Sequence, residues 1–180
     1  MLLKALPLLA LAACHGGRGK VVGSCPGFVA GDLSLPIELL PFASESGALI
    51  KDGDPVRLQR PSQGGFVIDV GARVRNLQAC GLSVGAQLID PATGKSLTEL
   101  DLRQGDFTAL LDGYFVSPAG DGEPNIPACP NYLGQTINGK KATLQIRVRD
   151  AQGRSTAVER SVTPACDAGD GACAIVCGPH

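Results

Sequence analysis

The C-terminal tail concentrates the side chains best suited to bind a metal ion. Cys166, Cys173, Cys177 and His180 follow one another with the spacing C-x₆-C-x₃-C-x₂-H. Zinc takes thiolate and imidazole ligands, but its structural sites commonly use cysteines separated by two to four residues. Because this spacing differs, and because an exported chain oxidises its cysteines, we favour disulfides over a Cys₃His zinc site. We predict no metal and no cofactor.

A second motif has the spacing of a serine nucleophile. Residues 81–85 read Gly-Leu-Ser-Val-Gly, the G-x-S-x-G pattern that in α/β-hydrolases holds serine on a sharp turn between a strand and a helix. Apolar residues alternate with small or polar ones through this motif, which predicts an uninterrupted strand. The only downstream histidine is the terminal His180. We therefore expect Ser83 to be an outward strand residue, and we predict no catalytic residue.

Acidic residues form three small groups among glycines. These groups are Asp52 with Asp54, Asp121 with Glu123, and Asp167 with Asp170. Calcium binds six to eight oxygens, and none of the groups reproduces the ligand pattern of an EF-hand loop. We expect solvated acids in turns. Paired carboxylates for sugar hydrolysis stay open at this point, because their separation is a property of the fold.

Arginines recur at strand edges and on polar strand faces. They are Arg57, Arg60, Arg73, Arg75, Arg147, Arg149 and Arg154. On neighbouring strands they would form a basic stripe able to meet anionic lipid or polysaccharide groups, although we favour a solvated face with local acidic partners. The net charge is -1, 18% of residues are charged and tryptophan is absent. These values argue against a nucleic-acid partner.

The N-terminus is typical of a secretory signal. Lys4 precedes an apolar run over residues 6–13 that ends in small side chains. This run is too short to span a bilayer core, which needs roughly 20 residues in a helix. We predict that residues 1–13 are a signal peptide. Ordinary signal cleavage after Ala12, with Cys14 left unmodified, is the alternative.

The junction Leu11-Ala12-Ala13-Cys14 resembles the lipobox of bacterial lipoproteins at all four positions. The resemblance implies cleavage before Cys14 and attachment of acyl chains, such as palmitate, to this cysteine. Several chains on one residue give a stable anchor, because each buried CH₂ contributes about 0.8 kcal/mol. In the sorting pattern of Gram-negative lipoproteins, His15 after the cysteine, rather than Asp, implies the outer membrane. Residues 14–27 would then be a lipid-anchored tether.

The cysteine count agrees with a lipid on Cys14. Seven cysteines cannot all pair within one chain, whereas removal of Cys14 leaves an even set. The six candidates for disulfide bonds are Cys25, Cys80, Cys129, Cys166, Cys173 and Cys177. Six cysteines allow 15 connectivities, and the sequence does not select among them.

Between the tether and the tail, strand patterns dominate. Alternation predicts strands over residues 66–75, 82–88 and 142–149, and the last of these forms a hairpin with residues 154–163 through an Asp-Ala-Gln-Gly turn. Further strands are expected over residues 37–40, 56–59, 95–102 and 107–116. We expect a long loop over residues 117–138, pinned by a disulfide at Cys129, and a disulfide-stapled tail.

The last hairpin resembles the final strands of bacterial immunoglobulin-like domains, and the stretch 52–56 is similar to bacterial envelope lipoproteins. Strand number and resemblance together predict an all-β fold: an immunoglobulin-like β-sandwich of about seven to nine strands, braced by disulfides. The predicted divisions are a β-sandwich domain over residues 28–165 and a cysteine-rich tail over residues 166–180. A chain of 180 residues is long enough to bury one core.

These expectations combine into a non-enzymatic, membrane-anchored lipoprotein that acts as a binding or accessory module at the cell envelope. Its expected partners are the membrane, through acyl chains on Cys14, and an envelope protein or polysaccharide. The alternative is an envelope hydrolase that uses dispersed carboxylates or a divalent metal, and convergent carboxylates in one cleft would favour it. A purely structural surface protein, the third reading, predicts no pocket.

Overall fold

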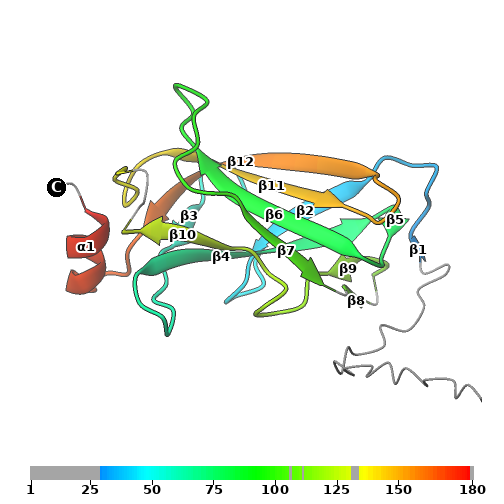
Figure 1. Ribbon diagram of the computed structural model, residues 1–180, viewed down its shortest axis with the longest axis horizontal. Helices are drawn as coiled ribbons and strands as arrows, with labels where there is room; N and C mark the ends of the chain where they lie inside the picture. The colour runs from blue at the N-terminus through cyan, green and yellow to red at the C-terminus, as the bar shows by residue number, and fades with distance from the viewer. Residues whose placement is uncertain (1–28, 106, 111, 131–133, 179–180) are drawn as a thin grey trace, which may run out of the picture.

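The protein is described by a computed structural model over residues 29–105, 107–110, 112–130 and 134–178. It is mostly β-structure in several sheets, one of them curled into a half-barrel, and the described residues include one short helix. Two large sheets lie against each other, and the helix sits at one end (Figure 1). The β-rich fold predicted from alternation is therefore confirmed.

The described residues form twelve strands and one helix. In chain order these are β1 (Val29–Ala30), β2 (Glu38–Ala43), β3 (Pro55–Arg57), β4 (Phe66–Arg75), β5 (Leu77–Gln78), β6 (Leu82–Ile89), β7 (Asp101–Gly105), β8 (Thr108–Ala109), β9 (Phe115–Val116), β10 (Asn125–Cys129), β11 (Ala142–Arg149), β12 (Ser155–Ala165) and α1 (Gly171–Cys177).

The first large sheet has the order β3-β12-β11-β6-β7. Its centre is the predicted hairpin, in which β11 and β12 pair antiparallel from Ala142 opposite Val162 to Arg149 opposite Ser155. The Asp150 carboxylate closes the turn, because it accepts hydrogen bonds from the backbone N–H groups of Gln152 and Arg154. Strand β3 joins the far edge by parallel pairing with the end of β12.

The second large sheet is built around β4, which pairs with β2, β9 and β10, while β8 pairs with β9. Gly71 lies directly opposite Phe42 of β2, and a Cβ atom at Gly71 would lie 2.0 Å from the end of the Phe42 ring. Any side chain at position 71 would collide with the Phe42 ring, so the packing of this ring explains the glycine in the middle of β4. A small two-stranded sheet, β1-β5, accompanies the large ones.

The core consists of the alternate residues that the two large sheets turn toward each other. Buried side chains at every second position of β6 and β11, such as Leu88 and Ile146, belong to one cluster with Ile68, Val70 and Val74 of β4. Burial of this apolar surface drives folding. It also explains why the period-2 pattern of the sequence located these strands accurately.

Several predicted segments differ from the structure. Two short strands, β8 and β9, replace the single strand expected over residues 107–116, since the N–H of Gly113 donates a hydrogen bond to the carbonyl oxygen of Leu110 between them. The return from β6 begins with a bridge between Ile89 and Ser96, but the regular ladder of β7 starts only at Asp101. Strand β10 lies within the expected loop, 117–138. Two-residue strands make the count higher than seven to nine.

The C-terminal tail ends in helix α1, which the sequence analysis did not predict. Asp170 caps it, and its carboxylate accepts a hydrogen bond from the backbone N–H of Cys173. Seven residues are too few for a stable isolated helix in water. Two disulfides hold it: Cys129–Cys177 joins it to β10, and Cys166–Cys173 joins it to the end of β12. The disulfide-stapled tail and the pinned loop are thus confirmed.

Candidate functional site

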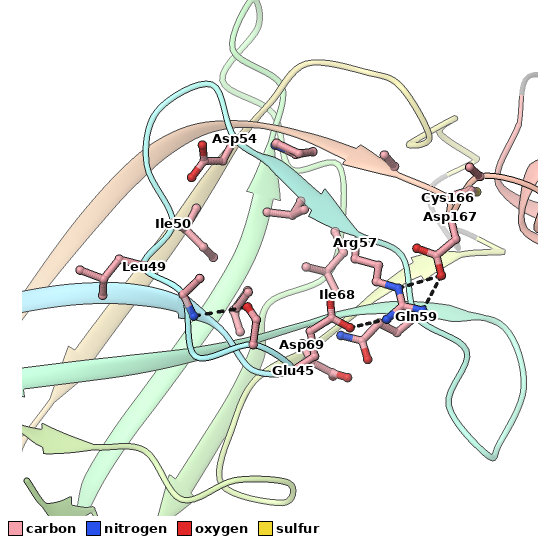
Figure 2. Close-up of a pocket in the computed structure, with 18 residues that line it drawn as sticks. Glu45, Leu49, Ile50, Asp54, Arg57, Gln59, Ile68, Asp69, Cys166 and Asp167 are labelled. Carbon is pink, nitrogen blue, oxygen red and sulfur yellow. Dashed lines mark hydrogen bonds and ion pairs between the residues drawn. The ribbon is translucent and has the colours of Figure 1, made fainter.

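A cleft of about 430 Å³ opens where β2, β3 and β4 meet the end of β12. Its apolar lining includes Ile50, Val56 and Ile68, and its charged lining is one guanidinium and four carboxylates, those of Glu45, Asp54, Asp69 and Asp167. Figure 2 shows Glu45, Asp69 and Asp167 gathered around Arg57 from separate segments, with Asp54 apart from them. We call this space the acidic cleft.

Arg57 fixes one side of the acidic cleft. Its Nε donates a hydrogen bond of 2.9 Å to Asp167 Oδ2, its Nη2 pairs with the same oxygen, and its Nη1 pairs with Glu45 (Figure 2). These hydrogen bonds raise the pKa of Arg57, chiefly through Asp167 and then Glu45. All three side chains are partly exposed, so the pairs add little to stability. Their effect is to hold the turn after β2, strand β3 and the tail together at the rim.

Asp69 lies beside Glu45 in the acidic cleft (Figure 2). It occupies the middle of β4, between the buried residues Ile68 and Val70, and its Oδ1 accepts a hydrogen bond of 2.6 Å from Nδ2 of Asn125. Burial raises the pKa of the Asp69 carboxyl, and the negative charge of Glu45 raises it further, while the Asn125 hydrogen bond lowers it. The cleft therefore contains a carboxyl that is more readily protonated than a surface aspartate.

Glu123 lies close to Asp69, in the turn that precedes β10. Only 6% of this residue is exposed, which corrects the expectation that the acids of the 121–123 group are solvated. Burial raises the pKa of Glu123, and the charge of Asp69 acts in the same direction. The physical reason for the correction is the pairing of β10 with β4, which draws the turn inward. The buried Glu123 thus lies next to the partly buried Asp69 of the cleft.

Glu123→Gln is expected to stabilise the protein at pH 7. The pKa of Glu123 is higher in the folded than in the unfolded chain, so the folded state binds more protons between the two pKa values, and stability falls as the pH rises through that window. Glutamine keeps the shape without the charge, so the gain should be largest at pH 7 and should shrink toward pH 4. Urea unfolding followed by circular dichroism at several pH values measures it.

Glu99→Gln, at an exposed position before β7, is the matched control and should leave the free energy of unfolding nearly unchanged. A loss of stability in Glu123→Gln that grows as the pH rises would contradict the prediction. It would mean that the hydrogen bonds accepted by the Glu123 carboxylate outweigh the cost of burying its charge.

The other acids singled out by sequence mostly hold turns. Asp52 accepts a hydrogen bond from the N–H of Ser161, and Asp54 accepts one from the N–H of Lys51. Asp54 and Asp167 also line the acidic cleft, so two of the three groups contribute to it. The sequence analysis missed Glu45 and Asp69. The sequence did contain an indication of Asp69, because this residue is the one acid within an otherwise apolar stretch of a predicted strand.

Ser83 lies on β6, which runs without a break from Leu82 to Ile89. Its hydroxyl donates a hydrogen bond of 3.4 Å to the carbonyl oxygen of Arg149 on β11. No helix follows the motif, as the strand pattern predicted, whereas a nucleophile elbow requires one. His180 lies outside the described residues. The geometry therefore gives Ser83 the role of a strand residue.

The cysteine cluster of the tail holds the only group of potential metal ligands among the described His, Cys, Asp and Glu residues. The sulfur atoms of Cys166, Cys173 and Cys177 lie within 4.8 Å of one another. The two disulfides bond all three of them, and a disulfide sulfur is not the thiolate that zinc requires. Cys80 is disulfide-bonded as well. Cys25, another of the six candidates, lies outside the described residues, as do Cys14 and the whole segment 1–28.

The arginines divide into paired and unpaired groups. Arg73 pairs with Asp112 and Arg75 pairs with Glu38, and both guanidinium groups lie over the ring of Tyr114. Such local partners match the favoured expectation. Arg147 and Arg149 differ: among the described residues, neither forms an ion pair.

In the part of the chain that is described, no helix has the length and apolar character needed to cross a membrane. Comparison with known proteins adds no relative: no protein-family model, curated protein or solved structure matches this sequence.

Proposed function

We propose that the protein is a non-enzymatic lipoprotein, anchored to the outer membrane through acyl chains on Cys14, whose β-domain is a binding module at the cell envelope. The lipobox pattern of residues 11–14 supports the anchor. The observation that carries the binding role is the acidic cleft, because a concave site with an apolar floor and a few convergent polar groups is the usual form of a ligand site.

The domain itself we propose to be immunoglobulin-like. In such folds one sheet holds strands G, F, C and C′ and the other holds A, B, E and D. The order β12-β11-β6-β7 corresponds to G-F-C-C′ in both sheet position and chain order, and β2-β4-β10 corresponds to A-B-E. This fold class hosts many unrelated binding functions, so it supports a module without specifying its ligand.

The lining of the acidic cleft favours a ligand with a cationic head and a short apolar body. Four carboxylates face one guanidinium, and that guanidinium is already engaged by Glu45 and Asp167. An ammonium group beside Asp69 would be attracted by the Asp69 carboxylate and by the nearby charge of Glu45. The side chains of Ile50, Val56 and Ile68 would cover an alkyl portion. An anionic ligand would be repelled.

Hexylamine, hexanol and hexanoate test this proposal, because they share one alkyl chain and differ in charge. We expect hexylamine to shift the NMR amide signals of cleft residues and to bind more tightly than hexanol, and we expect no binding of hexanoate. Asp69→Asn should weaken hexylamine binding on the order of fivefold, the effect of losing one nearby charge in partly exposed surroundings.

Asp121→Asn is the control, since Asp121 is an exposed acid that does not line the cleft. It should leave hexylamine binding unchanged. Equal binding of all three probes, or signal changes away from the cleft, would show that the acids of the cleft do not select the ligand, and the proposed site would be wrong.

A hydrolase is the second candidate, and convergence of carboxylates in one cleft is the observation that favours it. Asp69, with its raised pKa, would be the proton donor, and Glu45 would be the ionised partner. Their existing hydrogen bonds favour the binding role, because Asn125 occupies one oxygen of Asp69 and Arg57 engages Glu45. Hydrolysis of an envelope polysaccharide that is lost in Asp69→Asn would favour the hydrolase instead.

A further inference from the structure

The outer face of the first large sheet carries a second hollow, a groove of about 720 Å³. Two cross-strand rows form its floor. Arg147 of β11 lies opposite Gly85 of β6, which lies opposite Leu102 of β7. In the next row, Arg149 lies opposite Ser83. Small residues thus separate arginines on one side from leucines on the other, and we call this the leucine–arginine groove.

The leucines of this groove are exposed to an unusual degree for a sheet face. Leu100 is 37% exposed and Leu102 is 55% exposed. Gly85 lets them approach: a Cβ atom there would lie 3.1 Å from Leu102 Cδ1, 3.2 Å from Leu100 Cδ1 and 3.4 Å from Arg147 Cγ. The glycine therefore allows two apolar side chains and the stem of an arginine to gather over one point of the surface.

Two arginines without ion-pair partners in the described part of the chain lie beside this apolar patch in the groove. Elsewhere Arg57, Arg73, Arg75 and Arg103 form ion pairs, and Arg154 donates hydrogen bonds to backbone carbonyls. Among the described residues Arg147 and Arg149 have no such partner. Asp150 also lines the groove, but it is 3% exposed and backbone N–H groups hold its carboxylate. The groove thus presents two uncompensated positive charges beside exposed leucines.

The groove lies at the end of the molecule where the described chain begins. Val29 of β1 pairs with Gln78 of β5, and the N–H of Gln78 donates a hydrogen bond of 3.4 Å to Asp150 of the groove. Figure 1 shows β1 and β5 beside the turn that joins β11 to β12. Cys14 and Val29 are 15 positions apart, and a chain of that length reaches at most about 50 Å when fully extended.

We propose that the leucine–arginine groove is a membrane-docking face that binds the anionic lipid surface to which Cys14 tethers the domain. The arginines would meet lipid phosphates, and Leu100 and Leu102 would enter the apolar boundary below them. The acidic cleft lies near Ala165, at the other end of β12 from the groove residues 155–157, so docking would keep it away from the lipid charges that repel it. The proposal rests on the proposed anchor, because the anchor brings this face near the membrane. The test of vesicle binding does not depend on the anchor.

The test uses the full chain carrying Cys14→Ser, so that no acyl chain contributes, and vesicles of phosphatidylglycerol mixed with phosphatidylcholine. We expect the protein to sediment with these vesicles, to bind pure phosphatidylcholine vesicles at least tenfold more weakly, and to dissociate as salt is raised. Arg147→Ala with Arg149→Ala should lower the partition coefficient on the order of tenfold.

Three further variants separate docking from general charge and from misfolding. Lys51→Ala with Lys95→Ala removes the same charge from exposed sites outside the groove and should not change binding. Leu102→Ser should weaken binding on the order of tenfold but keep its salt dependence. Gln104→Glu adds a negative charge at the groove and should weaken binding without touching the arginines.

Equal loss of vesicle binding in the lysine control would overturn the proposal in favour of a diffuse charge effect. Absence of binding to phosphatidylglycerol vesicles, or binding that survives the double arginine change, would also overturn it. A protein crosslinked at the groove, with vesicle binding unaffected by the arginine change, would make this face a protein interface instead. Failure of the anchor itself would appear separately, as absence of acyl-chain incorporation at Cys14.

Discussion

Cys14→Ser is expected to abolish incorporation of radiolabelled palmitate and to move the protein from the detergent-requiring membrane fraction to the soluble fraction. The physical reason is the loss of the acyl chains, each of whose buried CH₂ groups contributes about 0.8 kcal/mol to membrane binding. The membrane-bound fraction should fall on the order of tenfold or more. Fractionation of cells that express the full chain, combined with palmitate labelling, measures both effects.

Cys25→Ser is the matched control, because Cys25 is the other cysteine of the N-terminal segment and lies outside the lipobox pattern. It should keep palmitate incorporation and membrane association. Palmitate incorporation that persists in Cys14→Ser, or an unlabelled wild-type protein cleaved after Ala12, would contradict the lipoprotein assignment. The acidic cleft would then belong to a secreted module.

Removal of the Cys129–Cys177 disulfide by a double change to alanine is expected to lower the free energy of unfolding by about 4 kcal/mol, from the chain entropy that a long closed loop removes from the unfolded state. The two cysteines are 48 residues apart. Both are buried, and their bond is a covalent link between α1 and β10. Urea unfolding followed by circular dichroism measures the loss.

The Cys166–Cys173 disulfide provides the comparison within the same cluster. Its cysteines are only 7 residues apart, so the same double change to alanine should cost roughly 2 kcal/mol. Non-reducing peptide mapping of the wild-type protein checks the pairing first. A larger loss for this shorter loop would contradict the entropic argument, and it would indicate that the link between the end of β12 and α1 dominates the stability of the tail.

The strands that the sequence located well are those with a period-2 pattern and one buried face. The predicted range 66–75 and the structural range of β4 coincide, and β11 begins and ends where its alternation does. Side chains at positions i and i+2 share a face of any strand, so this information is local. Segments whose structure depends on distant partners were less predictable. Strand β10 exists because β4 pairs with it.

The acidic cleft was only partly predictable for the same reason. Its acids come from a turn after β2, from the turn before β3, from β4 and from the tail. The Arg57 pair with Asp167 spans 110 residues. Asp69 was visible as a lone acid in an apolar strand pattern, but no spacing rule links it to Glu45. The notion of solvated acids in turns was wrong for Glu123, because burial depends on what packs over the turn.

The sequence by itself determined the lipobox pattern, the parity of the cysteines, the β-rich composition and the main strands, since each of these is expressed in neighbouring residues. Only the tertiary structure decided which cysteines pair in the tail, which carboxylates share a cleft, and which arginines lack partners. Fifteen pairings of six cysteines are compatible with one sequence, whereas a single arrangement of sheets brings Cys129 to Cys177 and Cys166 to Cys173. Long-range strand pairing and its register set the distances between these cysteines. Residues far apart in the chain determine that pairing jointly.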